Sequence, residues 1–159
     1  MIIDTLVTDR TQADVDRVNT LTGKWLAGTI TNAEKEEWLA GMKGAYNYTD
    51  LNRVGNAVAF IAGVLESAGT RVTVTAKNDW TMEDIPTTAQ AQALLTDLTL
   101  LKGSVRQPVP DVPVSMDNLT VETANRIEEI LVSVYNAINY EGANWERCGI
   151  AVCGVEGGL

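Results

Sequence analysis

Apolar residues recur every three or four positions in several segments of the chain, a spacing that places them on one face of an α-helix. The clearest stripe consists of Leu51, Val54, Val58, Ile61 and Leu65. The same spacing is found at about residues 11–27, 31–43, 87–102 and 120–140. The sequence therefore predicts a mainly α chain, folded as a compact bundle of about five helices.

One stretch changes period. Val72, Val74 and Ala76 alternate with polar residues in "RVTVTAK", which is typical of a short β-strand. Because a single strand needs a partner, we expect the N-terminal "MIIDTLV" to pair with residues 71–76. This prediction adds one small β element to the helical bundle.

The chain is expected to form one helical domain over residues 1–140, followed by a C-terminal tail, residues 141–159. Within the domain, residues 106–117 contain three prolines and are predicted to be a semi-rigid extended spacer. The tail has five glycines among its nineteen residues, so we expect it to be non-helical and to contact a neighbouring subunit. The candidate contact residues are Trp80, Trp145, Cys148, Ile150, Val152 and Cys153.

A formal net charge of −9 argues against a nucleic-acid partner, because phosphate binding depends on clustered Lys and Arg. The longest apolar run has nine residues, whereas a bilayer requires about 20, so membrane insertion is not expected. The N-terminus has no basic region followed by a cleavage site, which predicts synthesis in a cytosol without a signal peptide.

Little in the sequence indicates catalysis. The absence of histidine excludes Ser-His-Asp and Cys-His nucleophiles, and two cysteines are too few for a zinc site. Cys148 and Cys153 could form a disulfide, but free thiols are favoured in a reducing cytosol. The carboxylates Asp79, Glu83 and Asp84 fit the start of a helix better than an acid–base pair. We therefore expect no enzymatic activity and no cofactor or metal.

The densest polar stretch, "GAYNYTDLNRV", precedes the clearest apolar stripe. Asn47 suits a turn, Thr49 suits a helix cap, and Asp50 suits the first helical position. The side chains of Asn52 and Arg53 are expected to bind carbonyls or carboxylates of the preceding loop. The main prediction is a structural junction, with a partner-binding surface as the alternative. The residues concerned are Tyr46, Asn47, Tyr48, Thr49, Asp50, Asn52 and Arg53.

Four segments occur in the order "DRTQADVDRV", "MKGAYNYTDLNRVGNAV", "KNDWTMEDIPT" and "MDNLTVETANRIEEIL". Together they resemble a family of small structural proteins and modules of tailed phages and prophages of Gram-positive bacteria, found among tail-tip, baseplate and tail-fibre genes. The resemblance covers roughly residues 8–135. The chain departs from the family after Glu141, where short "SGE"-like repeats are usual. The family offers no catalytic residues to carry over.

This resemblance implies a non-enzymatic virion protein of the tail region, assembled in the host cytoplasm. Its expected partners are other tail proteins or further copies of the chain, in a homo-oligomer. The alternative is a receptor- or carbohydrate-binding module at the tail tip, which would use exposed Trp80 and Trp145. Trp25 and Trp38 fall on apolar helix faces and are expected in the core. A small acidic regulator that stays monomeric is a third possibility.

Overall fold

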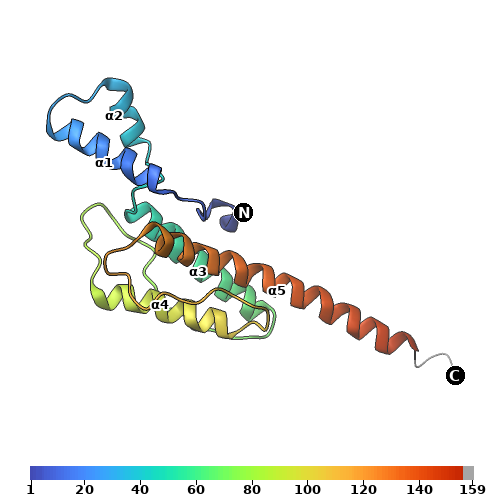
Figure 1. Ribbon diagram of the computed structural model, residues 1–159. Coiled ribbons are helices and arrows are strands. Elements are labelled where there is room, and N and C mark those ends of the chain that lie inside the picture. The colour runs from blue at the N-terminus through green and yellow to red at the C-terminus, as the bar shows by residue number, and fades with distance from the viewer. Residues whose placement is uncertain (156–159) are drawn as a thin grey trace.

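The structure is a computed structural model that describes the backbone of residues 1–155 and the side chains of residues 1–142. The described residues form five α-helices and a short 3-10 helix, which confirms the prediction of a mainly α chain (Figure 1). The elements are η1 (Ile2–Thr5), α1 (Gln12–Leu26), α2 (Asn32–Leu39), α3 (Tyr48–Ser67), α4 (Thr88–Gly103) and α5 (Val121–Val155).

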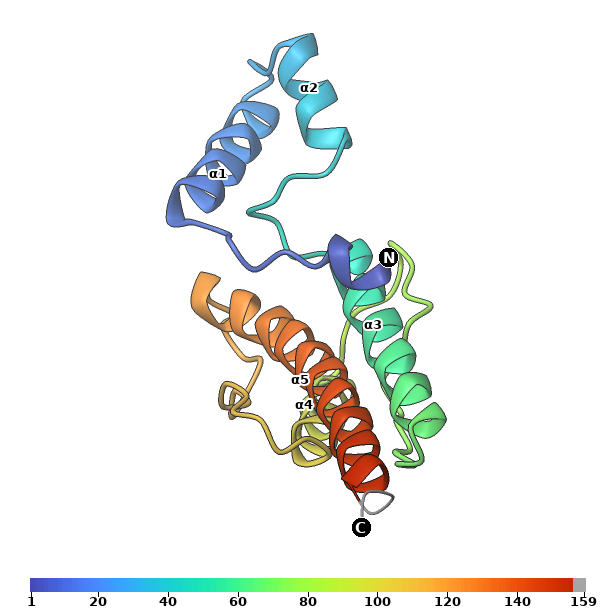
Figure 2. The same cartoon turned by 90° about the vertical axis from the view of Figure 1, so that its right-hand side faces the viewer.

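Helices α3, α4 and α5 pack side by side and enclose the core, with η1 laid against α3 and α5 (Figures 1 and 2). Each helix contributes the apolar stripe that its sequence predicts. Burying one such aliphatic side chain stabilises the fold by about 1.5–3 kcal/mol. The fully buried positions include Val54, Val58, Ile61, Leu98, Leu101, Ile127, Leu131 and Val134.

The predicted β element is wrong: the described chain contains no strand. Residues 2–5 form η1, and the segment 71–76 runs as a loop whose backbone hydrogen bonds are made to a side chain. The buried carboxylate of Asp97 on α4 accepts from the N–H of Thr75 at 2.7 Å and of Ala76 at 2.6 Å. Val72 and Val74 alternate with exposed residues because the loop packs one side on the core.

The loop then crosses α3 at very close range. A Cβ atom on Gly55 would lie 2.5 Å from the carbonyl oxygen of Lys77, so a side chain there would clash with the loop backbone. Glycine is thus required at this crossing for lack of space.

Helices α1 and α2 form an antiparallel pair, the arm, which projects from one end of the bundle (Figures 1 and 2). Leu21 is the only fully buried side chain described in these two helices. Trp25 is 44% exposed and contacts the partly buried Trp38 across the arm, with ring centroids 6.4 Å apart. The expectation that both tryptophans lie in the core is therefore wrong, because they pack on each other across the arm, whose two helices bury only Leu21.

Residues 106–117 connect α4 to α5 and lie against the bundle. Val109 and Val112 are partly buried on the core, and Asp111 pairs with Lys102 of α4 at 2.6 Å. The segment is therefore attached to the bundle at these positions, while Val114 is exposed to solvent.

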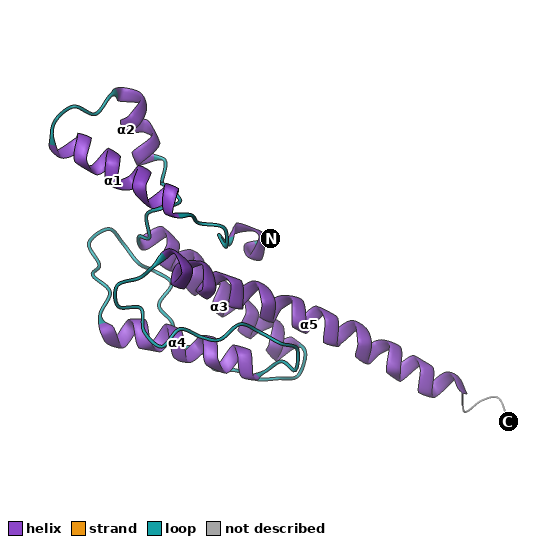
Figure 3. Cartoon of the chain, in the orientation of Figure 1, coloured by secondary structure: helices purple, strands orange, loops and turns teal. Residues whose placement is uncertain are grey.

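The prediction of a non-helical tail is wrong for residues 141–155, which continue α5 past the ends of α3 and α4 (Figure 3). Residues 156–159 lie outside the described residues. The sequence explains why this segment is helical. Its apolar residues follow Ile138 at helical intervals of seven, three and four positions, at Trp145, Cys148 and Val152. Each glycine weakens a helix by about 1 kcal/mol relative to alanine but does not end it.

Candidate functional site: a buried charged junction beside an open groove

The predicted junction residues lie at the start of α3, where the arm joins the bundle. Asn47, not Thr49, caps the helix: its side chain accepts from the N–H of Thr49 at 2.8 Å. The Asp50 carboxylate reaches back to the N–H of Asn47 at 2.9 Å, so Asp50 occupies the third helical position instead of the first. Together they form a capping box, which satisfies backbone donors at the helix N-terminus.

Four charged side chains meet beneath this cap. Glu128 of α5, which is 0% exposed, accepts from Arg10 at 2.7 Å and from Arg53 at 2.8 Å through Oε1. Its Oε2 atom accepts from Arg53 Nε at 3.0 Å. Asp50 pairs with both guanidinium groups through Oδ1. The two positive and two negative charges compensate one another, which is the condition for burying charges at acceptable cost.

Arg10 also ties together the two chain segments that lead into and out of the arm. Its side chain donates to the carbonyl oxygen of Val7 at 2.7 Å and to that of Lys43 at 3.2 Å. Its backbone exchanges hydrogen bonds with the side chain of Asn125 on α5, at 3.0 and 2.9 Å. The Val7 N–H donates to Glu128 at 2.6 Å. The junction thus fixes both segments to α3 and α5.

Sequence reasoning missed two of the four charged residues. Two adjacent acids such as Glu128 and Glu129 are typical of an exposed helix surface, but Glu128 is buried. A signal was present, since Glu128 lies four positions after Ala124 and three before Leu131, on the buried face of α5. Arg10 had no such signal, because it precedes the first α-helix.

The environment of the junction shifts two pKa values. Burial tends to lower the pKa of Arg53, but its hydrogen bonds to Glu128 and Asp50 outweigh this effect and raise the pKa above its ordinary value. Burial raises the pKa of Tyr46, and the nearby negative charge of Glu128 adds to the effect. The Arg10 guanidinium lies over the Tyr46 ring, 5.3 Å from its centroid. The Tyr46 hydroxyl is buried and has no hydrogen-bond partner among the described residues.

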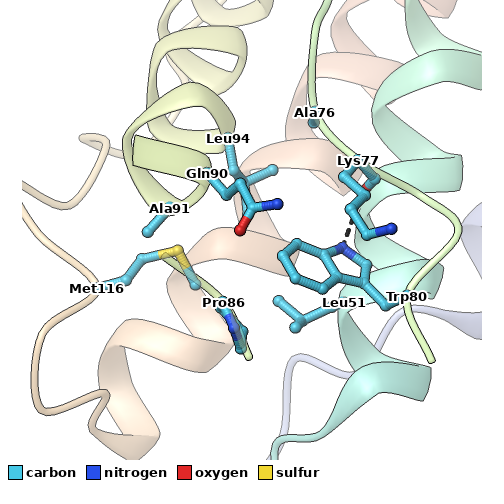
Figure 4. Close-up of a pocket in the computed structure, with 9 residues that line it drawn as sticks. All are labelled: Leu51, Ala76, Lys77, Trp80, Pro86, Gln90, Ala91, Leu94 and Met116. Atoms are coloured by element: carbon cyan, nitrogen blue, oxygen red, sulfur yellow. Dashed lines mark hydrogen bonds between the residues drawn. The ribbon is translucent and has the colours of Figure 1, made fainter. Parts of the chain in front are cut away.

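Asn52 connects α3 to a different segment. Its amide donates to the carbonyl oxygen of Trp80 at 2.8 Å and accepts from the Trp80 N–H at 2.6 Å. The indole Nε1 donates to the carbonyl oxygen of Lys77 at 3.0 Å, as Figure 4 shows. Trp80 is only 7% exposed, so its predicted role as an exposed contact residue is wrong.

The indole of Trp80 faces a small space between α3 and α4, together with Leu51, Pro86 and Met116 (Figure 4). The cavity has a volume of about 30 Å³, which leaves room for little more than a water molecule. It is a packing defect and offers no space for a ligand.

A much larger open groove, with a volume of about 690 Å³, also has Leu51 in its lining. Its lining comes from the end of α2, the link 40–47, the start of α3 and the loop 81–86. Tyr46 and Tyr48 line it, and Leu39 and Met82 are its most exposed apolar side chains. The junction therefore forms one wall of the groove, through its tyrosines and not its charges.

The remaining predicted residues are placed as follows. Asp84 accepts from the N–H of Thr81 at 2.7 Å, and Asp79 pairs with Lys77 at 2.7 Å, so both stabilise the turn before α4. Glu83 lies in that same turn and is exposed. The other candidate contact residues belong to α5, and their side chains lie outside the described residues: Trp145, Cys148, Ile150, Val152 and Cys153.

Over residues 1–142, no group of three or more acidic or cysteine side chains is arranged to hold a metal ion. Of the helices described, none is both long enough and apolar enough to cross a membrane. Comparison of the sequence with protein-family models gives no match, and neither do comparisons with curated proteins and with solved structures.

Proposed function

We propose that this chain is a non-enzymatic structural protein of the phage tail region, which acts in assembly by self-association or by docking to a larger tail or baseplate component. The observation that carries the proposal is the course of α5, which is anchored in the bundle and then runs on beyond it (Figures 1 and 3). The four motifs that resemble tail-region proteins support the same class of function.

The bundle holds the first part of α5 firmly. Ile127, Leu131 and Val134 are fully buried, and Glu141 accepts from the N–H groups of Arg106 and Gln107 at 2.6 and 3.2 Å. These contacts fix the direction in which the helix leaves the bundle.

The part of α5 after Gly142 is expected to gain stability from a partner. Most of the stability of a helix in a protein comes from tertiary packing of its apolar face. Its apolar residues Trp145, Cys148 and Val152 follow helical spacing, which suits a helix-mediated contact. A rigid bundle with such an extension is suited to assembly.

The charged junction supports this role by fixing the arm to the bundle. Its charges are paired with one another, so their geometry serves the fold. The alternative function, a carbohydrate-binding module, loses one of its two aromatic residues because Trp80 is buried and hydrogen-bonded.

The molar mass in solution, measured by size exclusion with light scattering, tests the proposal. The full chain is compared with a chain that ends after Gly142, which retains the Glu141 contacts. We expect a defined oligomer that becomes monomeric on truncation, with the helical circular-dichroism signal of the bundle retained. An oligomer that survives truncation would contradict the role of the α5 end. A monomer in both cases would contradict self-association.

A further inference from the structure

The open groove has the properties of a protein-binding site. Its volume of about 690 Å³ leaves room for several side chains of a partner. Two apolar side chains on its rim are turned to solvent, Leu39 at 76% and Met82 at 83% exposure. Apolar side chains gathered around a groove mark a site of interaction.

The arm side of the groove needs a covering partner more than the bundle side does. Helix α2 has no buried residue, although it carries Trp38 and Leu39. A helix usually becomes stable by burying an apolar face against another element. Apolar side chains of the arm, such as Leu39, therefore stay exposed on the side that faces the groove.

Charge permits a second copy of the chain as this partner. Residues 11–45 contain five acidic and four basic residues, so the arm has a net charge of −1 in a chain of −9. Two copies repel one another most where their acidic surfaces meet. Residues 143–155 contain one acidic and one basic residue, so a contact between this segment and the arm brings little like charge together.

The α5 end is the segment of that second copy that fits. In both views it leaves the bundle at the end opposite to the arm (Figures 1 and 2). Because the helix leads away from the arm, it does not reach the groove of its own chain. Trp145, Cys148, Val152 and Val155 are spaced by three, four and three positions, the pattern by which a helix anchors in an apolar groove.

We propose that the groove beside the junction receives the α5 end of a second copy, residues 143–155. This inference rests on the proposed function, since it names the partner of the α5 contact. A contact between different surfaces of identical chains is head-to-tail, and repetition produces a closed ring or an open filament. The groove and the α5 end are then two halves of one assembly contact.

Two full-length variants test the contact. Met82→Asp places a charge in the groove, at an exposed loop position where folding should be unaffected. Val152→Asp places a charge on the α5 end, and Cys148→Asp is a second variant of the same kind. Val114→Asp is the matched control, because Val114 is an equally exposed apolar loop residue outside this groove (94% exposed).

The masses of these chains are measured by light scattering under reducing conditions, with circular dichroism as the check on folding. We expect the wild type and Val114→Asp to form the same oligomer, and Met82→Asp and Val152→Asp each to be monomeric. Mixing the two monomeric variants should produce a complex of one chain of each kind and nothing larger. Such a complex requires one intact groove and one intact α5 end, and only a head-to-tail contact has this property.

Other outcomes would overturn the inference in distinguishable ways. If only Val152→Asp is monomeric, the α5 ends pair with one another, and the proposed function survives without the groove. If only Met82→Asp is monomeric, the grooves of two copies pair with one another. A monomeric wild type would remove self-association altogether and with it this contact.

Discussion

The three-helix bundle and the arm both contain amphipathic helices, but they are stabilised by different interactions. In α3 alone, Val54, Val58 and Ile61 are completely buried, whereas the arm buries Leu21. The order of the arm comes from capping boxes at both helix starts and from exposed ion pairs such as Arg17 with Glu37. Exposed ion pairs contribute only about 0–1 kcal/mol each. The arm should therefore open at a lower free energy than the bundle, as weakly packed regions generally do.

The largest effect is expected at the junction that joins the two regions. Glu128→Gln removes one of two negative charges and leaves Arg10 and Arg53 with Asp50 alone. Breaking a buried ion pair costs about 3–5 kcal/mol, and we expect a loss of this size in the free energy of unfolding. Chemical denaturation measures it.

Glu129→Gln is the matched control for this change. Glu129 is adjacent in sequence, is half exposed and lies 3.5 Å from Arg126. Its substitution should change the free energy of unfolding by about 0.5 kcal/mol at most. Equal, small effects at both positions would mean that the buried charges are dispensable.

The sequence predicts the bundle better than the junction, for a physical reason. Apolar periodicity reports which face of a helix is buried, and it correctly identified the stripe of α3. The junction depends on residues far apart in the chain: Arg10 and Glu128 are separated by 118 positions. No local pattern contains such a pair. Asp50 and Arg53 could be predicted from the sequence because both belong to one short motif.

The two wrong secondary-structure predictions have related causes. Alternation at Val72 and Val74 was interpreted as strand pairing, although it also arises when a loop packs one side on a core. In the C-terminal segment, the number of glycines outweighed the helical spacing of Trp145, Cys148 and Val152. In the first case the period reports burial of one side but does not identify the hydrogen-bond partner; in the second, glycine lowers the stability of a helix without ending it.

A second, more local effect is expected within the arm. Leu21→Ala removes its buried side chain, and a buried leucine truncation costs about 2–5 kcal/mol. We expect faster amide hydrogen exchange in α1 and α2, and little change in α3, α4 and the first part of α5. Leu26→Ala, at a largely exposed position of α1, should leave exchange unchanged. Acceleration across the bundle as well would show that the arm and bundle open as one unit.

The smallest effect is a pH dependence confined to the arm. A hydrogen bond from Lys24, followed by hydrogen bonds from Thr31, lowers the pKa of Glu34 to about 2. Because the folded-state pKa lies below the ordinary value of 4.5, this contribution to stability is present above pH 4.5 and is lost as the pH falls toward about 2.

Glu34→Gln retains a capping side chain for α2 but removes the charge that Lys24 binds, so it should reduce the acid-induced change. NMR chemical shifts of the α2 amides, followed through this pH range, measure the difference. Glu36→Gln changes an exposed position of the same helix, and its α2 amides should respond to acid like those of the wild type. If the α2 amides of Glu34→Gln still respond to acid as strongly as those of the wild type, the Lys24–Glu34 pair does not hold the arm together.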